Sequence, residues 1–70
     1  MNKNDKLRQS VKLLKAIGQI DSYIEIAEMI GIKNKSMYNW LRGEYQLGTE
    51  KLMILEAIVS DLWIPIDNEL

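Results

Sequence analysis

Residues 22–43 constrain the fold of this 70-residue chain more than any other stretch. Ser22 and Glu25 form a capping pattern, in which the serine hydroxyl accepts a hydrogen bond from a backbone N–H and the glutamate reaches back to the cap. A helix is therefore expected to begin at Tyr23. It should end at Gly31, because glycine adopts the left-handed conformation that turns a chain after a helix.

A second helix is expected over residues 33–41. Met37, Trp40 and Leu41 recur at spacings of three and four, and Gly43 follows as a C-cap. The start of this helix is open by one residue. Asn34 is the better capping type, whereas Lys33 occupies the position at which the turn would place the cap.

The two helices carry the residues that a steep helix corner requires. Such a corner needs a small residue at the contact, a turn residue free to take positive φ, and apolar residues at fixed offsets. Ala27 fits the contact, and Gly31 fits the turn four residues later. The apolar residues that would lock the corner are Ile26, Ile30, Ile32, Met37 and Trp40. We expect Met37 and Trp40 to belong to the core.

A further helix is expected on each side of the corner. The first runs from a cap at Asn4 or Asp5 to about Ile17, and Gly18 ends it. The second is capped by Thr49 and ends near residues 60–61. The apolar positions that should face inward are Leu7, Val11 and Leu14 in the first helix and Leu52, Leu55, Ile58 and Val59 in the second, with Met53 and Ile54 broadening the latter stripe.

Residues 63–70 form an apolar tail after a domain that spans residues 1–62. Pro65 lacks a backbone donor and disfavours helix at Ile64, so the tail should be extended and irregular. Leu62, which precedes the tail, and Trp63, Ile64 and Ile66 are too apolar to remain in water. They should either pack back on the core or contact a second copy or another partner.

Charge is divided unequally along the chain, although the net charge is only −1. Residues 1–42 hold eight basic and four acidic side chains, a balance of +4, whereas residues 43–70 have a balance of −5. The positive part contains the corner. The lysines of the first helix fit either a solvated face or a direct part in binding a polyanion.

Composition argues against catalysis and metal binding. The chain has no histidine and no cysteine, and none of its serines has an evident base, so we expect no enzyme, no metal site and no cofactor. No apolar run is long enough for a membrane span or a signal peptide. The sequence therefore predicts a cytoplasmic protein without a membrane partner.

With its Trp40-Leu41-Arg42-Gly43 ending, the 22–43 stretch resembles the helix-turn-helix of phage repressors and Cro proteins, the lambda-repressor-like family. The resemblance implies an all-α fold, a small bundle of four to five helices with a central helix-turn-helix. The flanking helices fit the family more loosely. The irregular C-terminal tail stands where family members usually carry a fifth helix, and the tail is then the candidate surface for a homodimer.

The resemblance also implies roles for individual residues. The helix over residues 33–42 would enter the major groove of double-stranded DNA, with base-reading residues Lys33, Asn34, Lys35, Tyr38 and Asn39. Phosphate contacts would come from Ser22, Tyr23, Ser36, Arg42 and Gln46.

Two functions follow from these patterns. The first is a small sequence-specific transcription regulator of phage or bacterial type that binds DNA as a dimer and occludes a promoter. The second is an antirepressor that uses the same fold to bind a repressor or another nucleic-acid-binding protein. The acidic 43–70 part and the apolar tail favour this alternative, because an acidic surface repels phosphate and attracts a basic protein.

Overall fold

A computed structural model describes residues 2–62 of the chain, and the described residues form four α-helices and no strand. The helices are α1 (Lys3–Ala16), α2 (Tyr23–Ile30), α3 (Asn34–Leu41) and α4 (Thr49–Leu62). The all-helical class predicted from the sequence is thus confirmed for this part. The predicted tail, residues 63–70, lies outside the described residues.

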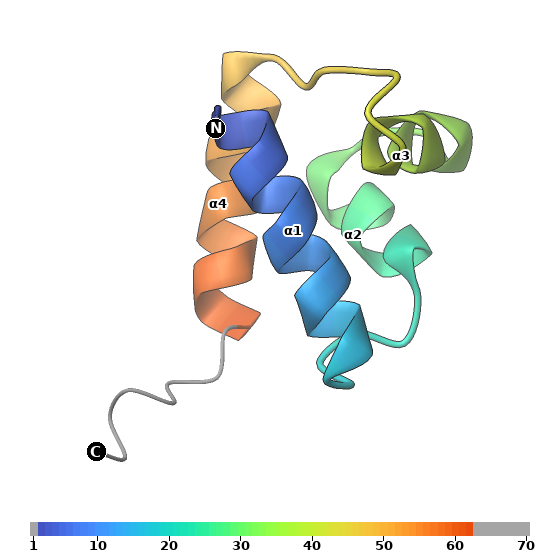
Figure 1. The fold of residues 1–70 in the computed structure, drawn as a ribbon, viewed down its shortest axis with the longest axis vertical. Coiled ribbons are helices and arrows are strands. Elements are labelled where there is room, and N and C mark those ends of the chain that lie inside the picture. Colours follow the sequence, from blue (N-terminus) through green and yellow to red (C-terminus); the bar gives the residue numbers. More distant parts are fainter. Residues whose placement is uncertain (1, 63–70) are drawn as a thin grey trace.

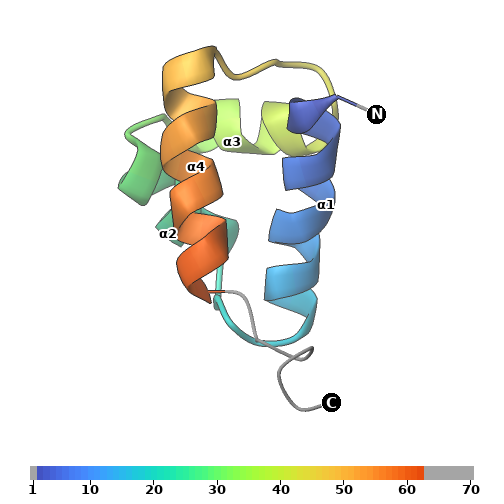
Figure 2. The ribbon, with the colours of Figure 1, turned by 90° about the vertical axis from the view of Figure 1, so that its left-hand side faces the viewer.

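The four helices form two crossed groups. Helices α1 and α4 lie side by side and run in the same direction, whereas α3 runs across them (Figures 1 and 2). Helix α2 packs against both α3 and α4. The α2–α3 pair therefore projects from one side of the α1–α4 pair and leaves the outer surface of α3 open.

The first helix begins earlier than predicted. Its cap is Asn2, whose side-chain oxygen accepts from the Asp5 amide at 2.8 Å, so neither Asn4 nor Asp5 caps it. The cap is an asparagine, as predicted, but it is Asn2. The Asn4 side chain instead forms hydrogen bonds with Trp40 and Leu47. The helix ends at Ala16, and Gly18 follows with φ +85°.

The α2–α3 corner agrees with the sequence pattern. Ser22 caps α2 by accepting from the Ile24 amide, and Gly31 ends it in the left-handed conformation, with φ +76°. The Ile32 amide then donates to the Ala27 carbonyl at 3.0 Å, which closes the turn. One detail of the capping pattern differs, because the Glu25 carboxylate accepts from the amide of Asp21 and not from that of Ser22.

Both ends of helix α3 agree with the prediction from the sequence. Lys33 occupies the cap position and makes no side-chain capping bond, so the helix begins at Asn34. After Leu41 the chain turns at Gly43, with φ +82°. The amides of Gly43 and Glu44 donate to the carbonyls of Trp40 and Asn39, which satisfies the end of the helix.

The last helix departs from prediction in three ways. It continues to Leu62, past the expected end near residues 60–61. Thr49 is its first helical residue, so it does not precede the helix as a cap. Met53 and Ile54 are 62% and 38% exposed and do not broaden the buried stripe. Helices α1 and α2 cover only one side of α4, so fewer of its apolar side chains are buried than predicted.

One apolar cluster occupies the space among the four helices. Its fully enclosed side chains include Val11 and Leu14 of α1, Ile26 of α2, Met37 and Trp40 of α3, and Leu55 of α4. Two connecting residues, Ile20 and Leu47, are also buried. The predicted inward positions Ile58 and Ile32 are partly buried against the cluster.

Candidate nucleic-acid interface

Helix α3 is held in place by its inward side. The predicted core residues Met37 and Trp40 have no exposed surface. The indole N–H of Trp40 donates to the Asn4 side-chain oxygen at 2.8 Å, and the same oxygen accepts from the Leu47 amide at 3.0 Å. Asn4 thus joins α1 to α3 and to the loop that follows it. No buried side-chain polar atom of residues 2–62 lacks a hydrogen-bond partner, so this contact holds α3 in position without leaving a polar group unpaired.

Arg8 of α1 also holds the C-terminal end of α3 and the loop that follows it. Its side chain is buried and donates to the Trp40 carbonyl, to the Tyr45 carbonyl at 2.9 Å and to the Gln46 side chain at 2.7 Å. The guanidinium also lies over the Trp40 ring, 5.4 Å from its centroid, and pairs with Asp5. Arg8 is therefore a structural residue, and its charge does not belong to an exposed basic surface.

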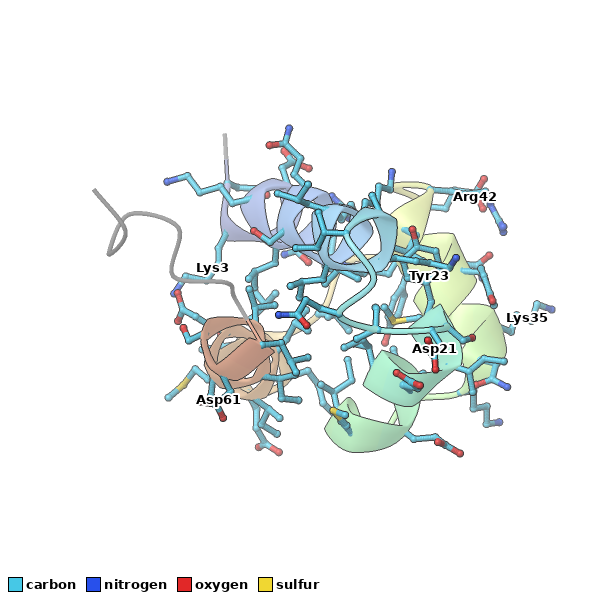
Figure 3. All side chains as sticks on the ribbon, turned by 90° about the horizontal axis from the view of Figure 1, so that it is seen from below. Lys3, Asp21, Tyr23, Lys35, Arg42 and Asp61 are labelled. Carbon is cyan, nitrogen blue, oxygen red and sulfur yellow. The ribbon has the colours of Figure 1, made fainter. Side chains whose placement is uncertain are left out.

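The beginning of α3 is the open part of the predicted base-reading face. Lys33, Asn34 and Lys35 are exposed, and none of their side chains has a hydrogen bond or ion pair within residues 2–62. Lys35 projects away from the body of the molecule (Figure 3). Ser36, one of the predicted phosphate contacts, is half-buried at the same end. Three donor-bearing side chains are thus free to meet a ligand together.

Two tyrosines connect α2 to α3 beside this end. The rings of Tyr23 and Tyr38 meet edge to face, with centroids 6.2 Å apart. Tyr23 is partly buried against the core, whereas Tyr38 is 40% exposed. The Lys15 ammonium of α1 lies over the Tyr23 ring at 5.6 Å. This brings a third helix, and a cation, to the surface that α2 and α3 share.

The predicted residues at the other end of α3 are engaged with one another. Arg42 donates to the side-chain oxygen of Asn39 and lies 3.5 Å from the Glu44 carboxylate. Since adenine recognition by asparagine uses both its oxygen and its amide, Asn39 would have to exchange Arg42 for a base. Asn39 and Arg42 are therefore less available than the residues at the start of the helix.

The remaining predicted phosphate contacts differ in availability. Ser22 uses its hydroxyl oxygen as the cap of α2. Asp21 precedes it and is exposed, which places a negative charge where a phosphate would approach. Gln46 holds Arg8 through its side-chain oxygen, so only its amide group could serve a ligand. The sequence had indicated both the capping role of Ser22 and its phosphate contact, whereas the bond between Gln46 and Arg8 was not predicted.

Only part of the positive charge of residues 1–42 lies near α3. Lys35 and Arg42 project from one side of the molecule, and Asp61 lies on the opposite side, at the end of α4 (Figure 3). Lys3 is also on that opposite side and pairs with Glu56 at 3.4 Å. The positive charge near α3 is thus contributed by fewer residues than the sequence balance of +4 suggested.

Sequence reasoning missed three residues that shape this surface, namely Asn4, Arg8 and Lys15. Apart from Asp5, which pairs with Arg8, the partners of Asn4 and Arg8 lie more than 30 residues away along the chain. No local pattern signals such contacts. Lys15 was included among lysines with two open roles, and only its approach to Tyr23 distinguishes it from the others.

Other kinds of site are not evident in the part of the chain that the structure describes. Residues 2–62 contain no surface pocket and no cluster of acidic side chains that could hold a metal ion. None of the four described helices has the length and apolar character to cross a membrane. No family model, curated protein or solved structure matches this chain.

Proposed function

We propose that this chain is a small DNA-binding transcription regulator of phage or bacterial type, with α3 as its recognition helix. The observation that carries the proposal is the two-sided character of α3. Its inward residues Met37 and Trp40 are fully enclosed, while Lys33, Asn34 and Lys35 at its start are exposed and free of partners within residues 2–62. A helix fixed on one side and rich in donors on the other suits insertion into a major groove.

The corner supports a lambda-repressor-like fold. Two helices of eight residues each are joined by a left-handed glycine, and the second crosses the direction of α1 and α4 (Figure 2). In a helix-turn-helix the first helix crosses the phosphate backbone as the second enters the groove. Lys15, beside Tyr23, would then add a phosphate contact from α1 to those expected from Tyr23, Ser36 and Arg42.

A dimer would explain how so short a helix achieves specificity. Two copies could place their recognition helices in successive major grooves, about 34 Å apart on one face of the duplex. The chain would then act by occluding a promoter. The dimer surface would lie away from α3.

Binding to random duplex DNA at several salt concentrations tests the proposal. Affinity should fall linearly on a logarithmic plot, because each neutralised phosphate releases counterions. Lys35→Ala should reduce the slope by about one. Lys3→Ala should leave it unchanged, because Lys3 lies on the opposite side of the molecule and pairs with Glu56 (Figure 3). An absence of binding at the lowest salt concentration would refute the proposal.

Base selection by two asparagine variants tests which residues read the sequence. Asn34→Ala should relax the preference at one position and cost about 1–3 kcal/mol on the preferred site. Asn39→Ala should have a smaller effect, because Asn39 is engaged with Arg42 and must be released first. Unchanged preference in both variants would refute this choice of reading residues.

A second candidate is an antirepressor that binds a repressor or another nucleic-acid-binding protein. The exposed carboxylates of Asp21 and Glu44 favour it, because they flank α3 and would attract a basic protein face. Purification of the chain from its native host distinguishes the two functions. Recovery of a stoichiometric basic protein would favour antirepression, whereas recovery of DNA alone would count against it.

A further inference from the structure

We propose that the ring of Tyr38 contacts the methyl group of a thymine in the major groove and that Tyr23 positions the ring for this contact. Because the contact lies on the exposed face of α3, it rests on the proposed function and specifies a base that this face selects. Three observations carry it: the exposure of Tyr38, its contact with Tyr23, and the polar character of its neighbours on α3.

Tyr38 supplies the apolar surface of the base-reading face. The other side chains expected to read bases, Lys33, Asn34, Lys35 and Asn39, all end in polar groups. Tyr38 is 40% exposed and adds an aromatic ring among them. On the base edges of the major groove, the thymine methyl is the distinctive apolar group, and the other distinguishing groups are hydrogen-bond donors and acceptors. The exposed ring therefore matches thymine better than any other base.

The ring of Tyr38 rests against a neighbour that is itself held in place. It meets the ring of Tyr23 edge to face, with centroids 6.2 Å apart and planes at 89°. Tyr23 packs against the core, and the Lys15 ammonium lies over its ring at 5.6 Å. Tyr23 lies next to α3, on the side of the molecule from which Lys35 projects (Figure 3). A ring supported in this way has little conformational freedom left to lose on binding.

Asn34 places a polar base-reading group beside this ring. Asn34 and Tyr38 are four residues apart on α3, so their β-carbons lie about 5–6 Å apart on the helix surface. Asparagine recognises adenine through its side-chain oxygen and amide. Since successive bases of one strand are spaced by about 3.4 Å, the adenine and the thymine methyl should lie within about two base pairs of each other.

Replacement of thymidine by deoxyuridine tests the contact, because it removes only the methyl group. A preferred duplex is first selected from random sequences with the full-length chain. Each thymidine is then replaced in turn, and affinity is measured by fluorescence anisotropy at one salt concentration. At a position within about two base pairs of the one that Asn34 reads, the affinity should fall about fourfold, as expected for burial of one methyl-sized group.

Variants of three tyrosines assign this loss to the ring of Tyr38. Tyr38→Phe retains the ring and should keep the loss, whereas Tyr38→Ala should bind the thymidine and deoxyuridine duplexes equally. Tyr23→Phe should also keep the loss, and Tyr23→Leu, which removes the aromatic neighbour, should reduce it. Tyr45, in the loop after α3, is 41% exposed and provides the matched control, so Tyr45→Ala should keep the loss.

Binding to random duplex DNA at low salt separates this contact from the proposed function. If such binding persists but Tyr38→Ala still discriminates thymidine from deoxyuridine, the role of Tyr38 is wrong and the proposed function stands. The same holds if no deoxyuridine position lowers the affinity, or if Tyr38→Phe loses the discrimination, which would assign the contact to the hydroxyl. An absence of binding to random duplex DNA would refute the proposed function and this contact together.

Discussion

Replacement of Arg8 by alanine should destabilise the domain strongly, although Arg8 belongs to a helix that is otherwise rich in exposed cations. The Trp40 carbonyl would keep the Gly43 amide as a donor but lose its hydrogen bond to the charged guanidinium, which contributes about 1.5–3 kcal/mol. The contact with the Trp40 ring contributes about 1–2 kcal/mol more. We therefore expect Arg8→Ala to lower the free energy of unfolding by about 3 kcal/mol, a large part of the total for a domain of this size.

Urea and thermal unfolding followed by circular dichroism measure this change. For so small a domain, a loss of this size should lower Tm by about 12–24 °C. Arg8→Lys should recover only part of the stability, because one ammonium group cannot reach the partners that the planar guanidinium bridges. Lys12→Ala removes an exposed cation from the same helix and should change stability by less than about 0.5 kcal/mol. Equal effects of Arg8→Ala and Lys12→Ala would refute the role given to Arg8.

Three further substitutions test other parts of the structure. Gly31→Ala should cost about 1–2 kcal/mol in urea unfolding, because φ is +76° there, while Gly48→Ala, with open space around it, should change little. Asn4→Ala should lower the free energy of unfolding by about 1–3 kcal/mol, because the buried indole N–H of Trp40 would be left unpaired. Asn4→Asp keeps the acceptor and should cost less. Equal losses in the two variants would contradict this contact. Glu44→Gln should strengthen binding to random duplex DNA at low salt, because it releases Arg42 and removes a negative charge. Weaker DNA binding by this variant would argue for a basic protein partner.

The α2–α3 corner was predictable because its determinants are local. Ser22, Ala27 and Gly31 act through contacts within a few residues, so their spacing alone sets the helix ends and the turn. The burial of Met37 and Trp40 followed from the same helical period. The ends of α1 and α4 were less certain, since several residues of the right capping type compete there.

The candidate surface was only partly predictable. The exposure of Lys33, Asn34 and Lys35 follows from their place at the start of a helix whose other side is apolar. The use of Arg8 as an internal support depends on partners 32 to 38 residues away, which no local pattern contains. The Arg42–Asn39 contact has the spacing of neighbours on a helix, and this spacing could have warned that the two side chains would meet.

The most direct test of the central claim is a titration of the isotope-labelled chain with duplex DNA at low salt, followed by the backbone amide signals. If α3 is the recognition helix, the largest shifts should fall on residues 33–39, with smaller ones at Lys15 and Tyr23. The amides of Met53 and Glu56 on α4 should remain in place. Shifts confined to α4, or no shift at any DNA concentration, would contradict the assignment of α3 as a DNA-binding helix.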